Sequence, residues 1–556
     1  MFLTIGLVCV FSFAKAQDPA QNDFEISKNI DIFVSLYKQL NSNYADNLNP
    51  GKLMKTAMDA MLRSLDPYTV YIPESDIEDY RFMTTGQYGG IGALIHKRGS
   101  YIYISEPYEN SPAAKSGLKA GDKILEVNGK SAKDKTVDEV STVLKGQPGT
   151  KVTLLLERDS TQKPFQVDIS REEIKIDNVP YSGILGDNIA YINLSEFKQE
   201  AAKDVKEAFV KLNQSTKLGG VIIDIRGNGG GLLNESVNIV NIFVDKGQTV
   251  VTTKGKIKDK NVVHKTQQAA VDTEIPLVIL VDENSASASE ILAGAIQDFD
   301  RGVIIGNRTF GKGLVQNIFP LSYNSEVKIT VAKYYIPSGR CVQALDYFNR
   351  DEEGNAPVLP DSLRKEFSTK NGRIVYEGSG IEPDIKIEPP LFEKITETLL
   401  EKNYFFDFAV LYNRKNSSIA PADKFEVTDD IYNQFLSFLK NKEYSYSTES
   451  ELALEDFKKA SESEKYFNDI KDDYDRVLQK ILKEKENDLA SNKEQIKMVL
   501  KMYLVPMYYY QKGRIQSSLA DDPEVLKAIE ILKNKEKYTS ILNGTNCETE
   551  NKNNKK

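Results

Sequence analysis

Residue Ser287 stands where a chemically active hydroxyl is expected. The segment Asn284-Ser285-Ala286-Ser287-Ala288-Ser289-Glu290 follows an apolar run and opens a stretch with helical periodicity. Backbone N–H groups at a helix N-terminus lack intrahelical partners, and together with the helix dipole they favour a negatively charged oxygen. The segment therefore fits a nucleophilic Ser287 whose reaction passes through an oxyanion. The alternative is structural, with Ser287 and Glu290 forming a capping box.

Lys312 lies in a second glycine-rich segment, Gly306-Asn307-Arg308-Thr309-Phe310-Gly311-Lys312-Gly313-Leu314-Val315-Gln316. The spacing is close to that of a phosphate-binding loop, but Gly313 stands where a Ser or Thr must bind magnesium, so nucleotide binding is disfavoured. A lysine can instead accept the proton of a serine hydroxyl. This role requires burial, because the pKa of lysine, about 10.4 in water, must fall by several units. The apolar neighbours Phe310, Leu314 and Val315 favour such burial.

A third segment, Asp224-Ile225-Arg226-Gly227-Asn228-Gly229-Gly230-Gly231, follows another apolar run. Adjacent glycines let a backbone turn tightly and approach a ligand closely. The Gly-x-Gly-x-x-Gly spacing of a dinucleotide loop is not met, so a cofactor of that kind is disfavoured.

Other catalytic schemes find little support among the residues present. The chain has two histidines, His96 and His264, and no Gly-x-Ser-x-Gly segment, which disfavours a Ser-His-Asp triad. Ser116 and Lys119 have the Ser-x-x-Lys spacing of penicillin-binding enzymes but lie within a predicted turn. The His-Glu-x-x-His pattern is missing from the sequence, and we expect neither a metal nor a cofactor.

The elements that must position these residues alternate between strand and helix over residues 175–390. Apolar runs at 189–194, 221–225, 277–281 and 303–305 predict buried strands. Helical stretches are predicted near 199–212, 232–244 and 287–298. This alternation indicates an α/β core.

Residues 86–174 have a different pattern, with short strands separated by turns. The run Ser111-Pro112-Ala113-Ala114-Lys115-Ser116-Gly117-Leu118-Lys119-Ala120-Gly121-Asp122 and the Asn128-Gly129 turn resemble a PDZ domain. In such domains a glycine-rich loop binds a peptide's terminal carboxylate, and the adjoining strand accepts the peptide as an added strand. By this resemblance the loop comprises Gly90, Ile91, Gly92 and Ala93. The alternative is a small β domain without a ligand.

The glycine, serine and lysine segments, in this order along the chain, resemble the C-terminal processing, or tail-specific, peptidases of serine protease family S41. The resemblance covers roughly residues 25–390 and includes Tyr334-Tyr335-Ile336-Pro337-Ser338-Gly339-Arg340 and Gly380-Ile381-Glu382-Pro383-Asp384. It implies that Ser287 is the nucleophile, that Lys312, 312 − 287 = 25 positions later, is the base, and that Gln316 orients the lysine. The N–H groups of Ala288 and of Gly229 or Gly230 would stabilise the oxyanion.

The implied fold is α+β and multidomain. We expect a signal peptide at 1–16, a helical region at 24–85, a PDZ domain at 86–174, a ClpP/crotonase-like protease core at 175–390 and charged helices at 391–556 ending in a disordered tail. The signal is predicted from the apolar start and the Ala14-Lys15-Ala16 cleavage pattern, although the usual positive charge before it is missing. A buried N-terminal helix is the alternative.

These features together predict an exported, periplasmic or otherwise extracytoplasmic, serine endopeptidase. Protein substrates with apolar C-termini are the expected partners, and the terminal helices are candidates for homodimer contacts or for docking an adaptor. The net charge of −9 argues against nucleic acid, and no apolar run after the signal reaches membrane-spanning length. A non-catalytic peptide-binding scaffold of the same fold is the main rival, and an ATP-dependent factor is a weaker one.

Overall fold

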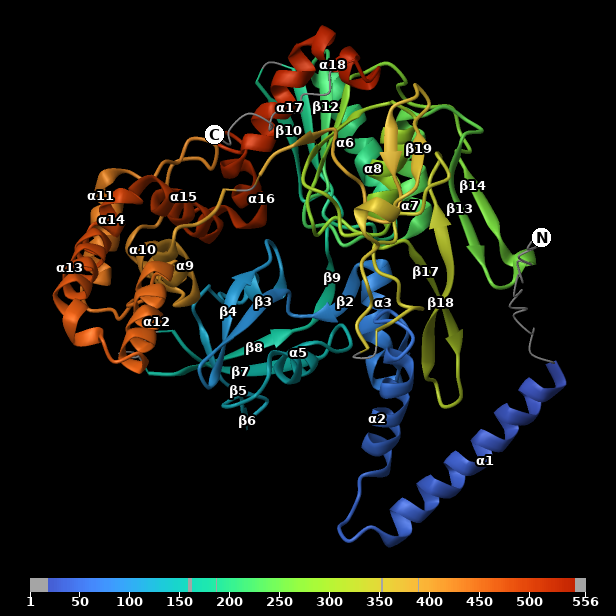
Figure 1. Cartoon of the computed structure of the whole chain (residues 1–556), viewed down its shortest axis with the longest axis horizontal. Coiled ribbons are helices and arrows are strands. Elements are labelled where there is room, and N and C mark those ends of the chain that lie inside the picture. Colours follow the sequence, from blue (N-terminus) through green and yellow to red (C-terminus); the bar gives the residue numbers. More distant parts are fainter. Residues whose placement is uncertain (1–18, 159–162, 187, 352–353, 389, 546–556) are drawn as a thin grey trace, which may run out of the picture. The chain divides into compact units, whose positions relative to one another are not determined.

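The computed structural model describes residues 19–158, 163–186, 188–351, 354–388 and 390–545 (Figure 1). The predicted signal peptide at 1–16 and the polar tail after residue 545 lie outside these residues. The chain divides into two compact units, Met1–Tyr71 and Ile72–Lys556. The candidate chemical residues all belong to the second unit.

The first unit contains two helices, α1 (Pro19–Asn43) and α2 (Pro50–Arg63). The side chain of Asn49 caps α2 by accepting from the Lys52 N–H at 3.0 Å, as expected of an Asn N-cap followed by proline. Helix α2 ends at Arg63, and in the turn that follows Asp66 accepts from the N–H groups of Tyr68 and Thr69 at 2.8 Å each.

The second unit begins with short elements and then forms the PDZ-like domain. The first are η1 (Glu74–Asp76), α3 (Ile77–Thr85) and β2 (Gln87–Gly90); β1 (Val70–Ile72) spans the division. The domain itself has β3 (Ala93–Arg98), β4 (Tyr101–Pro107), α4 (Pro112–Lys115), β5 (Lys123–Val127), β6 (Lys130–Ser131), α5 (Val137–Leu144), β7 (Lys151–Glu157) and β8 (Phe165–Ser170), and β9 (Glu172–Lys175) leads out of it.

The sheet of this domain has the strand order β3-β4-β5-β7-β8. The predicted Asn-Gly hairpin is confirmed: Asn128 and Gly129 both have positive φ, 51° and 73°, and they join β5 to β6. Alternate residues of the strands, such as Ile102, Ile104 and Leu154, form a buried apolar core. Strand β3 lies at one edge of this sheet.

The α/β core contains a sheet with the order β10-β11-β12-β15-β16-β21. Its elements are β10 (Tyr181–Leu185), β11 (Ile189–Asn193), α6 (Ala201–Ser215), β12 (Gly220–Asp224), α7 (Leu233–Phe243), β15 (Leu277–Val281), α8 (Ala288–Asp298), β16 (Val303–Gly306) and β21 (Ile385–Lys386). Pairing from β11 to β21 is parallel. Each of the four predicted strands and three predicted helices is present, with limits within a few residues of those expected.

Side chains on successive positions of these strands enter two different cores. Ile223 and Ile279 point toward α6, α7 and α8, whereas Ile222 and Val278 pack against the C-terminal helices α17 (Pro523–Lys533) and α18 (Lys535–Leu542). Figure 1 shows the red helices α17 and α18 beside β12 and β10. The sheet is therefore covered on both faces, as is usual for parallel sheets, and its second cover comes from the end of the chain.

A second, antiparallel sheet lies beside the first and contains β17, β18, β13 and β14. The elements are β13 (Thr249–Gly255), η2 (Lys258–Lys260), β14 (Val262–Lys265), β17 (Leu314–Pro320) and β18 (Glu326–Tyr335); η3 (Asp361–Leu363), β19 (Glu366–Ser368) and β20 (Ile374–Tyr376) follow. The pairing of β17 with β18 shifts register between Val315 and Gln316, a bulge that redirects the side chains on either side of it.

The remaining C-terminal helices pack around aromatic residues that include Phe405, Phe408 and Phe435. They are α9 (Lys394–Glu401), α10 (Tyr404–Lys415), α11 (Asp429–Leu439), α12 (Glu449–Ser463), α13 (Phe467–Glu486), α14 (Asp488–Ser491), α15 (Lys493–Leu504) and α16 (Pro506–Ser518). Among the residues described, no helix combines the length and apolar character needed to cross a membrane. The architecture is the expected α+β one, with a PDZ-like domain, an α/β core and C-terminal helices.

Candidate active site

Ser287 lies in the turn between β15 and α8, immediately before the first residue of the helix. Its φ and ψ angles are 58° and −110°, a conformation that residues other than glycine rarely adopt. The side chain is half-buried, whereas every residue of α8 is buried. A strained turn held by a buried helix is a recurrent feature of functional sites.

Glu290 connects this turn to the segment that carries Lys312. The carboxylate is fully buried. One oxygen accepts from the backbone N–H groups of Ser287 and Lys312 at 2.8 and 2.9 Å, and the other accepts from the Thr309 hydroxyl and the Gly311 N–H, both at 2.7 Å. Burial raises the pKa of the Glu290 carboxyl, and the four donated hydrogen bonds oppose that rise.

The capping-box interpretation of Glu290 is therefore correct but incomplete. The bond from the Ser287 N–H is the one that a capping glutamate forms. The other three bonds reach residues 309–312, which are distant in sequence. Glu290 consequently fixes the backbone of the serine turn relative to that of the lysine segment.

Tyr334 forms a second connection between the same two segments. It projects from β18 and is buried. Its hydroxyl lies 3.1 Å from the carbonyl oxygen of Ser287 and 2.8 Å from that of Lys312. Burial, with the nearby Glu290 carboxylate, raises the pKa of Tyr334 well above its usual value, so the hydroxyl keeps the proton that it donates.

The side chains of Lys312 and Gln316 are both half-buried. Leu314 is buried and Val315 packs against the main core, but Phe310 is 51% exposed. Of the three expected apolar neighbours, two thus lie in buried surroundings and Phe310 does not. The Gln316 amide donates to the Thr330 hydroxyl of β18 at 3.2 Å.

The glycine segment lies against Ser287. A Cβ atom placed on Gly230 would lie 2.8 Å from the Cβ of Ser287 and 2.9 Å from the backbone nitrogen of Ala288. This contact, with a φ of 97°, requires glycine at position 230. The predicted partners Gly230, Ser287 and Ala288 are thereby brought together.

Asn228 holds this segment in place from a fully buried position. Its side chain donates to the Leu194 carbonyl at 2.7 Å and accepts from the Gly230 N–H at 2.9 Å, while its carbonyl accepts from the Ala286 N–H at 3.1 Å. The N–H of Gly230 is thus engaged in the structure, whereas those of Gly229 and Ala288 have no acceptor among the described residues. Proximity to Ser287 favours Gly230 as an oxyanion donor and an unengaged N–H favours Gly229.

Arg226, two residues before Asn228, connects the glycine segment to the C-terminal helices. Its guanidinium bonds Asp224 at 2.6 Å and pairs with Asp522 at 2.8 Å and with Glu524. The Tyr191 hydroxyl donates to Asp224 at 2.6 Å. Burial raises the pKa of Glu524, an effect that Arg226 opposes.

The predicted peptide-binding residues Gly90, Ile91, Gly92 and Ala93 lie where β2 leads into β3. The carbonyls of Ile91 and Gly92 accept from the N–H groups of Ala113 and Tyr108 at 2.8 and 2.9 Å, which turns both carbonyls inward. A hollow of about 30 Å³ next to them is lined by Ala93, Ile95 and Leu144, among others, between β3 and α5.

Neither histidine lies in a catalytic arrangement. His96 Nδ1 is 2.7 Å from the Ser105 hydroxyl, but the nearby Asp407 carboxylate is paired with Arg98. Burial, assisted by Arg98, lowers the pKa of His96, and burial also lowers that of His264, which lies on β14. Within the described part of the chain, no cluster of three potential metal ligands occurs.

The sequence did not predict the contacts of Tyr334, Asn228 and Arg226. Of the four hydrogen bonds that Glu290 accepts, it predicted only the one within the capping box. Each of these residues lies in a segment that the sequence had already singled out. Their types were a usable signal, because buried Asn, Arg and Glu side chains must find partners.

Comparisons with known proteins agree with this architecture. The model of "Peptidase family S41" matches residues 188–349, that of "PDZ domain" matches 103–158, and that of "Probable PDZ-protease, C-terminal helical domain" matches 395–532. A "Carboxy-terminal-processing protease" of Bartonella bacilliformis is 32% identical over 397 residues, covering 71% of this chain and 82% of the relative. A "Probable CtpA-like serine protease" of Staphylococcus aureus is 32% identical over 434 residues, covering 78% of this chain and 76% of the relative.

Among solved structures, the photosystem II D1 C-terminal processing protease is 26% identical, with a TM-score of 0.34, and covers 64% of this chain and 92% of its own. The fold and its sequence matches define a serine-type endopeptidase. The chain belongs to peptidase family S41, among the carboxy-terminal-processing members that contain a PDZ domain.

Proposed function

We propose that the chain captures apolar C-terminal tails of exported proteins through its PDZ domain and cleaves those proteins with Ser287 and Lys312. One observation supports this most strongly. The backbones of Ser287 and Lys312 are joined by the same two buried side chains, Glu290 and Tyr334. Such a double connection keeps a nucleophile and a base at a constant separation.

In the first step the Ser287 oxygen attacks the carbonyl carbon of the scissile bond, and its proton passes to the Lys312 amine. The negative charge on the carbonyl oxygen is stabilised by N–H groups of Ala288 and of Gly229 or Gly230. Lys312 then gives the proton to the leaving amine as the C–N bond breaks, which leaves an acyl-enzyme. A water molecule then attacks the acyl carbon while Lys312 accepts its proton. The ester bond to Ser287 breaks, Lys312 returns the proton to the Ser287 oxygen, and the acid is released. Gln316 orients the lysine without adding a negative charge.

The tail would bind along β3, with its carboxylate at Gly90, Ile91, Gly92 and Ala93. Strand β3 is at the edge of its sheet, and a hollow separates it from α5. An edge strand next to a helix is where PDZ domains accept peptides. The same proposal includes export through the signal at 1–16 and contacts of the terminal helices with a second copy or an adaptor. It also includes domain divisions at 24–85, 86–174, 175–390 and 391–556.

Cleavage of a folded reporter with an apolar C-terminal tail tests this function. The unaltered protein should cleave the reporter, and Ser287→Ala and Lys312→Ala should each lower the rate at least about a thousandfold. Ser322→Ala and Lys217→Ala, at exposed positions of a turn and a helix end, should cleave normally. Tail binding without cleavage by the unaltered protein would establish the rival scaffold instead.

A further inference from the structure

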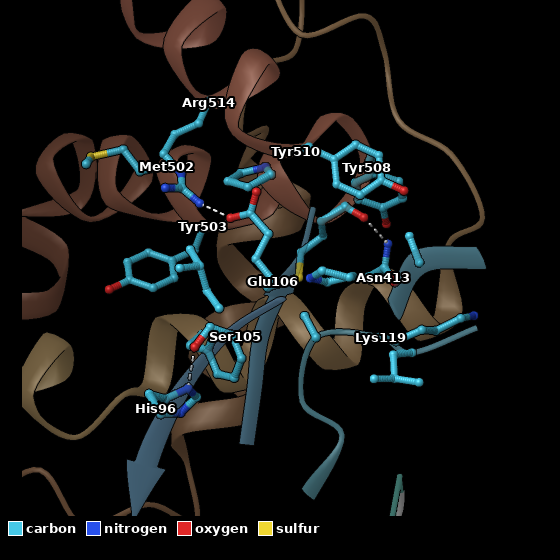
Figure 2. A pocket seen from close by; sticks show the side chains of 18 of the residues that line it. His96, Ser105, Glu106, Lys119, Asn413, Met502, Tyr503, Tyr508, Tyr510 and Arg514 are labelled. Carbon is cyan, nitrogen blue, oxygen red and sulfur yellow. Dashed lines mark hydrogen bonds and ion pairs between the residues drawn. The ribbon is translucent and has the colours of Figure 1, made fainter. Parts of the chain in front are cut away.

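A large cavity lies between the PDZ-like domain and the C-terminal helices (Figure 2). Its volume is about 960 Å³. One wall is formed by β3, the end of β4 and the turn near Lys119, and the other by α10, α15 and α16. The volume is in the range of sites that bind small molecules or short peptide segments.

Strand β3 has the large cavity on one face. On its other face lies the hollow between β3 and α5, here called the α5 groove, where the tail is proposed to bind. Ala93 and Ile95 line the α5 groove, whereas Leu94 and His96, together with the next residue Lys97, line the large cavity. This alternation follows from the period of two in a strand. Leu94 is 45% exposed, so its side chain is accessible from the cavity.

A tail that adds to the edge of β3 continues the same alternation. The side chains level with Ala93 and Ile95 point into the α5 groove, and those between them point to the face of Leu94 and His96. These intervening side chains would therefore be directed toward the large cavity rather than into solvent.

The opposite wall of the cavity has an apolar, adaptable part that includes Phe406, Met502, Tyr503 and Met507, beside the polar residues Asn403, Asn413 and Ser417. The Phe406 ring meets the His96 ring edge to face at 5.1 Å. Methionine and aromatic side chains accept large apolar groups of varied shape.

Among the described residues that line the cavity, the one carboxylate is paired with a cation. Glu106 pairs with Arg514 of α16 and also accepts from the backbone N–H of Gln511. Figure 2 shows this pair between the two walls. An acidic group is thus not presented to an incoming side chain, and the part of the lining formed by Phe406, Met502 and Met507 can receive apolar ones.

We propose that this cavity is a second subsite for the substrate tail, which selects large apolar or aromatic residues at the positions that alternate with those read by the α5 groove. The inference rests on the proposed binding of the tail along β3. It assigns a role in substrate selection to the C-terminal helices, which supply Phe406 and Met502.

Fluorescence anisotropy with labelled tail peptides and full-length Ser287→Ala protein tests the subsite. Two tails share their groove-facing residues and their free carboxylate, and carry Phe or Ser at the two intervening positions nearest the C-terminus. The Phe tail should bind about tenfold more tightly. In the double variant Phe406→Ala/Met502→Ala this advantage should fall to about twofold, while Met498→Ala, on the same helix as Met502 but outside the cavity, should keep it.

Equal affinities for the two tails, or a Phe advantage that persists in the double variant, would overturn the subsite. If amidating the tail carboxylate changes neither affinity, the proposed capture at β3 fails instead, so the two failures are distinguishable.

Photo-crosslinking keeps the test independent of the variants. A tail with benzoylphenylalanine at an intervening position should label α10 or α15 in the otherwise unaltered chain, and labelling confined to α5 would refute the proposal.

Discussion

At the scale of single residues, Glu290 offers a direct test of how the two reacting groups are held. Glu290→Gln replaces one carboxylate oxygen with an NH₂ group, which must face two of the four donors. Unsatisfied buried donors cost about 1–3 kcal/mol each, so with two of them stability should fall by about 2–6 kcal/mol. The proposed positioning role adds a decrease in kcat of about a hundredfold with little change in KM.

Urea unfolding and steady-state cleavage of a tailed reporter measure these two effects. Glu283→Gln, at an exposed position in the same turn, is the matched control. A Glu290→Gln protein with normal kcat would mean that the glutamate only caps α8.

Tyr334 permits a milder change at the same connection. Tyr334→Phe removes the hydroxyl that reaches the carbonyls of Ser287 and Lys312 and should cost about 0.5–1.5 kcal/mol of stability. The lost hydroxyl weakens the connection between the two segments, so kcat should fall about tenfold while KM stays constant. The decrease stays this small because the phenyl ring still fills the same space. Tyr335→Phe, at the next position of β18, should leave kcat unchanged, and equal kcat values in both variants would contradict the role given to Tyr334.

The lowered pKa values of the two histidines lead us to expect that the stability of the folded chain depends on pH. The unfolded-state pKa is about 6.5, and burial lowers the pKa values of His96 and His264 in the folded state. As pH falls below about 6.5 the unfolded chain therefore takes up protons first, and stability present at neutral pH is lost. Both side chains are only half-buried, so the effect on Tm between pH 7.5 and 5.5 should be about 1–3 °C.

Thermal unfolding of the double variant His96→Gln/His264→Gln over this pH range checks the assignment. The double variant should lose less Tm on acidification than the unaltered chain. An identical loss would show that carboxylates alone cause it.

At the scale of elements, the glycine segment after β12 must approach the serine turn closely. Gly230→Ala would place its Cβ 2.6 Å from the Ala286 carbonyl oxygen, a backbone atom that cannot easily move. Together with the positive φ, this should cost about 3 kcal/mol or more and reduce kcat at least about a hundredfold. In Gly227→Ala, also at positive φ but with open space around its Cβ, only the conformational cost of about 1 kcal/mol should appear.

Elements were predictable where their own residues determine them. The short apolar runs at 221–225 and 277–281, rich in Val and Ile, favour buried strands, and the Asn128-Gly129 pair determines its turn. The roles of Ser287 and Lys312 follow from the resemblance to family S41 and stay predictions, because the residues alone also fit a capping box and a loop close to a phosphate-binding one. The contacts of Tyr334 and Asn228 could not be predicted, since both depend on segments that meet only in the folded chain.

At the scale of the whole molecule, the C-terminal helices α17 and α18 cover one face of the parallel sheet in the protease core. Val525, Ala528, Ile531 and Leu532 of α17 pack on the face of the sheet that includes Ile222 and Val278. The sequence indicated charged helices there, but charge describes only their solvent side. An apolar helix stripe does not reveal which surface it covers, so this placement could not be predicted.

Because α17 also reaches Arg226, the C-terminal helices should affect catalysis directly. Asp522 and Glu524 pair with the Arg226 guanidinium, as does Asp224, and all four side chains are largely buried. Arg226 is close in sequence to Asn228 and Gly230. If its guanidinium is held by fewer carboxylates, the position of the glycine segment should change, which affects the oxyanion site rather than tail binding. Glu524→Gln should therefore lower kcat about tenfold, leave the Kd for a tail peptide unchanged, and reduce stability by about 1–3 kcal/mol.

Glu530→Gln provides the matched control on the same helix. Glu530 pairs with Lys527 and Lys537 at the surface, where ion pairs contribute about 0–1 kcal/mol, and its loss should not change kcat. Measuring kcat, tail affinity and urea unfolding in both variants separates a catalytic effect from a loss of folded protein. If Glu524→Gln lowers stability but retains full kcat in the folded fraction, α17 serves only to cover the sheet, and the connection through Arg226 has no part in catalysis.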